Sequence, residues 1–171
     1  MLSALTFRRR FADLTEQEVL ALAISSEEDD ARIYRSFAER LRADFPASAA
    51  VFDGMALEED GHRQRLIDLH RARFGEVIPL IRREHVAGFY ARRPVWLAQS
   101  LSLETMRGEA AAMEKTAHDF YVSAAARTQD AATRRLLGDL AAAEAGHERH
   151  AQSLEEAHLS LDAREAEDQT A

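Results

Sequence analysis

Apolar residues recur at alternating steps of three and four along most of this chain, which is the spacing of helices that bury one face. Thr15 followed by Glu18 has the form of a helix-capping pair, and Pro46 and Gly75 are typical breaks between helices. No stretch shows the sustained alternation of β-branched residues that indicates strands, so no sheet is expected. The pattern predicts four long helices, at about residues 16–44, 47–74, 96–127 and 130–160.

The links between these helices predict the topology. The first and second helices are joined by only a few residues, and so are the third and fourth, so each pair is expected to form an antiparallel hairpin. Residues 75–95, which include Pro79 and Pro94, are long enough to run back along the bundle, with a short helix expected around 78–90. Two antiparallel hairpins joined by a long crossover form an all-α, ferritin-like four-helix bundle.

Composition agrees with an all-α protein and excludes several classes of function. Ala, Glu, Arg and Leu dominate, whereas the chain has only 3 Pro and 7 Gly. The net charge of −8 disfavours a nucleic-acid partner and favours cations. The absence of cysteine excludes disulfides, zinc ribbons, iron–sulfur clusters and thiol catalysis. No apolar run approaches the ~20 residues of a membrane span and no signal peptide is recognisable, so a soluble domain is expected.

The apolar stripe of each predicted helix is interrupted at mid-height by residues that can bind metal. The first half of the chain has a glutamate and then an E-x-x-H, and the second half repeats this arrangement at nearly the same spacing. The two residues of an E-x-x-H lie one helical turn apart, so both can reach the same ion. The six candidate ligands are Glu27, Glu59, His62, Glu114, Glu144 and His147.

A metal site explains why such polar residues occupy core positions. An unpaired buried carboxylate costs several kcal/mol or takes up a proton, and four that face one another repel strongly. Two divalent cations neutralise four carboxylates, and hard carboxylates with one imidazole per ion suit iron or manganese. The sequence therefore predicts a di-metal centre in the middle of the bundle, with iron as the preferred ion and Mn or Zn as substitutes.

Two tyrosines follow the first glutamate of each half by two helical turns. Tyr34 lies after Glu27, and Tyr121 lies after Glu114, on the same stripes. The favoured interpretation is that each tyrosine hydroxyl hydrogen-bonds a carboxylate of the opposite helix. The alternative is that the two tyrosines also donate an electron during oxidation.

The remaining histidines show no comparable pattern. His118 lies beside the third stripe and is expected at the rim of the site rather than as a ligand. A further E-x-x-H, formed by Glu155 and His158, lies off the stripe at the end of the last predicted helix and is expected to be solvated. Surface positions are expected for His70, His85 and His150.

The paired glutamates, the two E-x-x-H motifs and the trailing tyrosines resemble the rubrerythrin and ferritin-like di-iron family over about residues 16–160. Residues 14–34, 45–67 and 78–97 look more narrowly like the N-terminal domain of the membrane-bound ferritin family. In that family a rubrerythrin-like domain precedes a membrane domain similar to vacuolar iron transporters. The resemblance implies bridging carboxylates at Glu59 and Glu144, terminal carboxylates at Glu27 and Glu114, and nitrogen ligands at His62 and His147.

Two departures from the family disfavour a self-contained peroxidase. Peroxide-reducing rubrerythrins carry an extra glutamate on helix three where this chain has Ala117, and they carry a cysteine-held iron domain, whereas this chain has no cysteine. The resemblance further implies a role in iron export under iron, acid or peroxide stress, at the cytoplasmic face of the inner membrane. A homodimer is also expected. Because the membrane half is absent, we expect the chain to be part of a longer protein.

We therefore expect a domain that binds two Fe(II) ions and oxidises them with dioxygen or peroxide, in the service of an iron transporter. The alternatives are a non-catalytic sensing, loading and dimerisation domain of an iron transporter, and a bundle that uses Zn or Mn only as a structural cross-link. The expected divisions are a basic arm at 1–15, the metal-binding bundle at 16–160 and an acidic tail at 161–171. Both ends are expected to be mobile, with residues 8–10 facing either anionic lipid or solvent.

Overall fold

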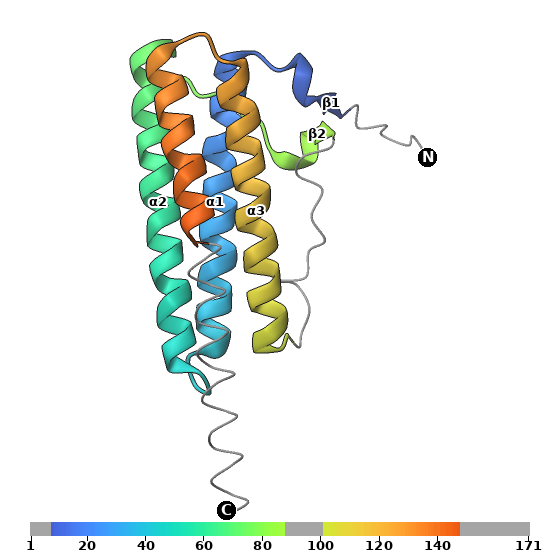
Figure 1. Ribbon diagram of the computed structural model, residues 1–171, viewed down its shortest axis with the longest axis vertical. Helices are drawn as coiled ribbons and strands as arrows, with labels where there is room; N and C mark the ends of the chain where they lie inside the picture. Colours follow the sequence, from blue (N-terminus) through green and yellow to red (C-terminus); the bar gives the residue numbers. More distant parts are fainter. Residues whose placement is uncertain (1–7, 88–100, 148–171) are drawn as a thin grey trace, which may run out of the picture.

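Four helices lie side by side in the computed structural model, which describes residues 8–87 and 101–147 (Figure 1). They are α1 (Glu16–Leu41), α2 (Pro46–Phe74), α3 (Leu103–Arg127) and a fourth helix, orange to red in Figure 1, described over 131–147. The predicted all-α bundle of two hairpins is confirmed. Among the described residues, no helix is both long and apolar enough to cross a bilayer.

The helix ends follow local signals in the sequence. Thr15 caps α1, since its Oγ1 accepts from the Glu18 N–H at 3.2 Å and the Glu18 carboxylate accepts from the Thr15 N–H at 2.8 Å. Pro46 lies in the first turn of α2, where its missing N–H costs nothing. Gly75 ends α2 with a φ of 85°, which glycine adopts without strain.

Two predicted helix boundaries differ from the structure. α1 ends at Leu41, three residues before its predicted end, because the chain reversal into α2 uses the next four residues. α3 begins at Leu103 instead of near residue 96, because Ser102 caps it by accepting a hydrogen bond from the Thr105 N–H at 3.0 Å. The predicted end of the fourth helix lies outside the described residues.

The N-terminal segment packs against one end of the bundle instead of forming a mobile arm. β1 (Arg9–Arg10) pairs in parallel with β2 (Val86–Ala87) of the crossover and is followed by η1 (Phe11–Asp13). Arg127 of α3 donates to the main-chain carbonyls of Phe11 at 2.5 Å and of Leu14 at 3.0 Å. Leu14 is itself buried. The expectation of mobility is therefore wrong for residues 9–14, because contacts with α3 hold them, and the short strand pair was not predicted.

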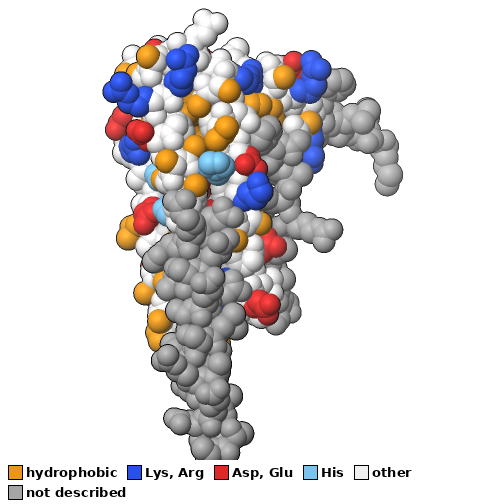
Figure 2. Space-filling model, in the orientation of Figure 1, with side chains coloured by type: hydrophobic (Ala, Val, Ile, Leu, Met, Phe, Trp, Pro, Cys, Tyr) orange, Lys and Arg blue, Asp and Glu red, His pale blue; other side chains and the backbone are white. Residues whose placement is uncertain are grey.

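The basic residues of this segment are paired with carboxylates of the same domain. Arg9 lies 2.5 Å from a carboxylate oxygen of Glu18, and Arg10 lies 2.8 Å from one of Asp13. Basic side chains gather at this end of the bundle, drawn at the top of Figure 2. Because these ion pairs are exposed, each contributes little to stability. The pair of Arg9 with Glu18 links the segment to α1, whereas that of Arg10 with Asp13 lies within the segment.

The crossover is held on α1 by a buried ion pair. It contains η2 (Arg83–His85), a single turn, where a short helix was expected around 78–90. That expectation is wrong for the rest of the described stretch, because residues 78–82 are not helical and Val86–Ala87 pair with β1 as a strand. Residues 88–90 lie outside the described residues. Arg83 is 7 % exposed and donates to the Ser26 main-chain carbonyl and to the Asp30 carboxylate, both at 2.6 Å. A buried charge is tolerated only when it is paired and hydrogen-bonded. This contact therefore fixes one point of the crossover against α1.

Two apolar clusters fill the bundle and leave a polar layer between them. The first, at the end that carries the N-terminal segment, includes Leu20, Leu66, Phe120, Leu137 and Leu140. The second, toward the turn between α1 and α2, includes Ile33, Phe37, Phe52, Met106 and Met113. The candidate ligands lie between these clusters along the helices, so packing on both sides holds their backbones in position.

His70 is buried, which corrects its predicted surface position. It lies four residues after Leu66 and therefore on the same buried stripe of α2. The imidazole ring centroid lies 5.6 Å from that of Phe74. Neither ring nitrogen has a hydrogen-bond partner, so the core accommodates an unsatisfied polar side chain.

His85 and His118, the described histidines that are neither candidate ligands nor His70, lie at intermediate depth. The Nδ1 atom of His85 accepts a hydrogen bond from the Arg82 N–H at 3.2 Å, so the residue is half-buried instead of fully at the surface. His118 lies at the rim, as predicted, with Nδ1 2.8 Å from the main-chain oxygen of Ala141. The described residues do not include His150, Glu155 or His158.

Replacing His70 with leucine is expected to raise the free energy of unfolding of the metal-free domain by about 1–2 kcal/mol, because a buried polar group without a partner carries a desolvation cost of that order. Urea unfolding at pH 7 measures the change. As a control for core sensitivity, Leu66→Ala should lower the free energy of unfolding by about 2–5 kcal/mol. A leucine variant that is less stable than the parent would contradict this account.

Candidate metal centre

The six predicted ligands lie in one layer in the middle of the bundle and come from all four helices. Glu27 belongs to α1, Glu59 and His62 to α2, Glu114 to α3, and Glu144 and His147 to the fourth helix. Their ligand atoms form two groups, each within 4.8 Å: Glu27, Glu59, His62 and Glu144, and then Glu59, Glu114, Glu144 and His147. Glu59 and Glu144 belong to both groups, as carboxylates that bridge two ions must.

The two imidazoles face the carboxylates through Nδ1. His62 Nδ1 lies 3.2 Å from oxygens of both Glu59 and Glu144, and His147 Nδ1 lies 3.1 Å from Glu114 Oε2. The two rings are stacked, with centroids 5.9 Å apart. Burial lowers the pKa of His62, whereas the hydrogen bond with Glu114 raises the pKa of His147. The two half-sites are therefore alike in composition but different in electrostatics.

Two buried tyrosines cross-link the layer. The Tyr34 hydroxyl of α1 donates to Glu114 of α3, and the Tyr121 hydroxyl of α3 donates to Glu27 of α1. These are the hydrogen bonds expected between each tyrosine and the opposite helix. Burial, reinforced by the charge of Glu114, raises the pKa of Tyr34 well above its usual value, so this phenol stays a donor. Electron donation by the tyrosines stays a prediction.

Burial controls the protonation of the metal-free carboxylates, which are at most 3 % exposed. Burial, reinforced by the charge of Glu59, raises the pKa of Glu27 well above its usual value. It likewise raises the pKa of Glu144 strongly and that of Glu59 to about 8. For Glu114 burial acts in the same direction, but hydrogen bonds, above all from His147, outweigh it and lower the pKa. The metal-free layer therefore holds protons at neutral pH.

The donor set fits hard divalent cations. Glu144 Oε1 is buried and receives no hydrogen bond, although His62 Nδ1 lies 3.2 Å away. A buried carboxylate oxygen without a donor is destabilising unless a cation takes the place of the donor. Carboxylates with imidazoles are ligands that Fe, Mn and Zn accept. The residues present therefore fit two ions, one at each overlapping group.

Comparison with known proteins agrees with this geometry. A family model described as rubrerythrin matches residues 18–155. The chain belongs to the rubrerythrin family. A solved structure of a hypothetical protein from Pyrococcus furiosus, 24 % identical, matches with a TM-score of 0.70 over 88 % of this chain and 94 % of that one, which supports the fold. No curated protein matches the chain.

Membership in the rubrerythrin family confirms the ferritin-like bundle and suggests di-iron binding, with which the carboxylate and histidine layer is compatible. The match covers the bundle and carries no information on a transporter. The narrower resemblance to the membrane-bound ferritins therefore stays a prediction.

This rubrerythrin differs from peroxide-reducing members beside the site. Ala117, three residues after Glu114, is partly buried against the apolar core, so no carboxylate occupies that place. The equivalent place in the first half, three residues after Glu27, holds Asp30, which is 5 % exposed and bound by Arg83. On the α1 side the layer is thus bordered by an additional carboxylate, and an arginine neutralises it.

Sequence reasoning missed three residues next to the layer. Asp30 lies on the core stripe one turn after Glu27, and that spacing could have revealed it. Arg83 lies in the crossover, where no periodic signal exists. Glu58 lies off the stripe, yet its Oε2 pairs with Nε2 of His147 on the neighbouring helix. The contacts of Arg83 and Glu58 therefore become visible only in the folded structure.

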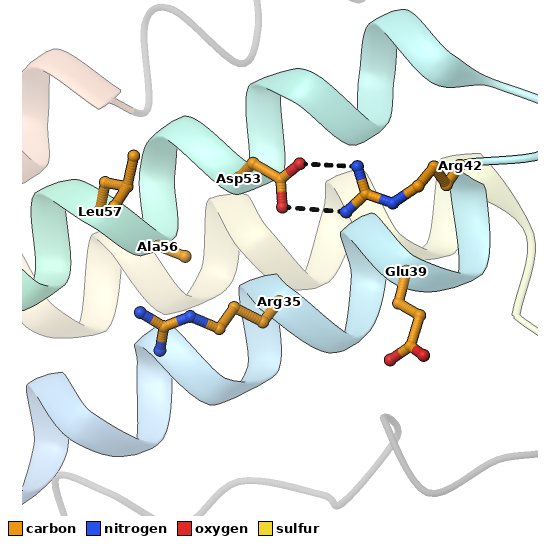
Figure 3. A pocket seen from close by; sticks show the side chains of 6 residues that line it. All are labelled: Arg35, Glu39, Arg42, Asp53, Ala56 and Leu57. Atoms are coloured by element: carbon orange, nitrogen blue, oxygen red, sulfur yellow. Dashed lines mark hydrogen bonds and ion pairs between the residues drawn. The ribbon is translucent and has the colours of Figure 1, made fainter.

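An open surface pocket of about 540 Å³ lies between α1 and α2, apart from this layer (Figure 3). It is lined by Arg35, Glu39, Arg42, Asp53, Ala56 and Leu57. Its charges are largely matched, since Arg42 donates to Asp53 at 3.0 Å and Arg35 pairs with Asp60. None of the six candidate ligands lines it, so we assign it no part in metal binding.

Glu59→Gln is expected to stabilise the metal-free domain at pH 8 but not at pH 5. The pKa of Glu59 rises from 4.5 to about 8 on folding. The folded state therefore keeps a proton that the unfolded state releases, and the associated stability is complete below pH 4.5 and lost as pH rises through 8. Glutamine does not ionise, so the variant does not lose this stability as pH rises. Its free energy of unfolding should exceed that of wild type by on the order of 2–4 kcal/mol at pH 8.

Urea unfolding of metal-free wild type and variant at both pH values measures this difference. Asp60→Asn, which removes a carboxylate beside Glu59 that pairs with Arg35 at the surface, is the matched control. Its difference from wild type should be the same at pH 5 and pH 8. A parallel pH dependence of wild type and Glu59→Gln would contradict the raised pKa of Glu59.

Proposed function

We propose that this domain binds two Fe(II) ions as substrates in the central layer and oxidises them, with dioxygen or hydrogen peroxide as the electron acceptor. The observation that carries the proposal is the pair of overlapping ligand groups that share Glu59 and Glu144. Two Fe(II) ions held side by side release two electrons together, which, with two protons, reduce one hydrogen peroxide to two waters. A lone ion in either group supplies only one electron.

The residues of the layer bind the ions and manage protons. Four carboxylates neutralise the charge of two divalent ions, and the protons held by Glu27 and Glu144 in the metal-free state leave as the ions enter. Tyr121 and Tyr34 each donate to one oxygen of a glutamate, Glu27 and Glu114 respectively, and so orient its carboxylate. The apolar clusters border the layer on both sides, and the four carboxylates between them are at most 3 % exposed.

We do not propose a self-contained rubrerythrin peroxidase. Repeated turnover needs a supply of electrons, and the chain has no cysteine to hold the iron domain that provides them in those proteins. Ala117 stands where they carry an extra glutamate. The chemistry that the layer supports is therefore one oxidation for each pair of ions loaded.

We further propose that the domain serves iron export as part of a longer protein, as a homodimer beside a membrane transporter domain at the cytoplasmic face of the inner membrane. The support is the resemblance of residues 14–34, 45–67 and 78–97 to the membrane-bound ferritins. In the second candidate function, the same layer senses or loads iron for the transporter without oxidation. That candidate needs the same ligands and differs only in oxidant consumption.

Anaerobic Fe(II) titration with metal counting is expected to give about two ions per chain, followed by consumption of one two-electron equivalent of oxidant when oxygen is admitted. Glu59→Ala, which removes an oxygen donor from both ligand groups, should lose both ions. Asp60→Ala, at the adjacent surface position, should keep both.

The outcomes separate the two candidate functions. Two ions bound reversibly without loss of oxidant would favour the sensing and loading function. Fewer than two ions in the wild-type domain, or binding by Glu59→Ala equal to wild type, would refute the proposed site itself.

Tyr34→Phe and Tyr121→Phe are each expected to keep two ions per chain but to weaken Fe(II) binding about tenfold, because the terminal glutamate loses its orienting hydrogen bond. Anaerobic titration measures the affinity. Electron paramagnetic resonance after an oxygen pulse tests the alternative role. A tyrosyl radical that appears in wild type and is absent from one variant would identify that tyrosine as an electron donor.

A further inference from the structure

Glu58 contacts a ligand of the metal layer from outside. Its side chain is 56 % exposed on α2, next to Glu59, and its Oε2 reaches Nε2 of His147 on the fourth helix. The other ring nitrogen, Nδ1, lies 3.1 Å from Glu114 Oε2 within the layer. The imidazole of His147 is therefore held between two carboxylates, one inside the site and one outside.

Within the part of the chain that the structure describes, the other half-site has no such contact. All three ion-pair contacts of His62 with described carboxylates, those of Glu27, Glu59 and Glu144, are made by Nδ1. Glu58 directly precedes the glutamate of its E-x-x-H, and the residue that precedes Glu144 in the other motif is Ala143. The internal repeat therefore supplies an outer carboxylate to one histidine only.

Glu58 is placed to orient a ligand and not to be one. It belongs to neither group of converging ligand atoms among the described residues. A carboxylate that accepts the Nε2–H of a metal-binding histidine fixes the tautomer, leaves Nδ1 free for the ion and makes the ring a stronger ligand. The net charge of an exposed carboxylate contributes little by itself, because water screens it. The geometry of the ring is what Glu58 controls.

We propose that Glu58 is a positioning residue for His147 and that it makes the two ion sites unequal, with the ion between Glu114 and His147 bound more tightly than the ion beside His62. This inference rests on the proposed binding of two ions. It also predicts the order of binding: the first ion binds at the site that contains His147, which Glu58 supports.

Calorimetric titration of the metal-free protein with Co²⁺, a redox-stable probe ion under air-free conditions, tests the inference without any activity measurement. Wild type should bind two ions in two resolved steps. Glu58→Ala should weaken the tighter step about 10–100-fold and leave the other step unchanged. Glu58→Gln keeps an oxygen that accepts the Nε2–H, so it should recover most of the lost affinity.

Two further variants complete the design. Glu28→Gln removes a carboxylate that likewise neighbours a ligand but pairs with Arg32 at the surface, so both steps should stay as in wild type. Ala143→Glu places a carboxylate at the matching position of the other half and should tighten the weaker step. This gain does not depend on the folding of the Glu58 variants.

The possible results are distinguishable. If Glu58→Ala weakens both steps equally or neither, or if Glu58→Gln loses as much affinity as Glu58→Ala, the positioning role is wrong while the two-ion site stands. If Ala143→Glu leaves the weaker step unchanged, the assignment of the weaker step to His62 is wrong. If wild type binds fewer than two Co²⁺ ions, the proposed function fails, and this inference fails with it.

Discussion

Four carboxylates share the centre of an otherwise apolar bundle, and their mutual repulsion is the constraint on which the rest of the structure depends. Each is at most 3 % exposed, so water cannot screen them. An uncompensated charge at that depth costs several kcal/mol, which is comparable with much of the stability of a domain of this size. The layer must therefore hold either protons or cations, and the apolar clusters on both sides supply the stability that lets it exchange one for the other.

Hydrogen bonds from two tyrosines orient two carboxylates of the layer. Tyr34 and Tyr121 tie α1 to α3 in opposite directions, each by a hydroxyl that donates to a glutamate of the other helix. These donors hold the carboxylates apart in chosen orientations, so ion binding does not have to order flexible side chains. Preorganisation of this kind needs neutral donors, and burial keeps the phenol of Tyr34 protonated by raising its pKa.

Much of the fold and of the candidate site could be predicted from the sequence, because the buried residues of a helix recur every three or four positions. The stripe located the helices and the six residues that the structure brings together, from Glu27 to His147. The same period includes His70, which lies four residues after Leu66 and is buried with it. Contacts between distant segments leave no period, so Glu58 against His147 and Arg83 against Asp30 could not be predicted. The packing of residues 9–14 against α3 could not be predicted either, because it depends on Arg127, which is distant in the sequence.

The departures from the internal repeat matter more for chemistry than the repeat itself. A perfect repeat would make two equal ion sites, but three residues after the first glutamate the halves carry Asp30 and Ala117, and before the E-x-x-H glutamate they carry Glu58 and Ala143. Asp30 borders the first half-site, where Arg83 cancels its charge, while Glu58 supports the histidine of the second. An oxidant that approaches such a pair meets ions in different environments. The asymmetry of the protein residues is therefore the feature that distinguishes the two proposed ion sites.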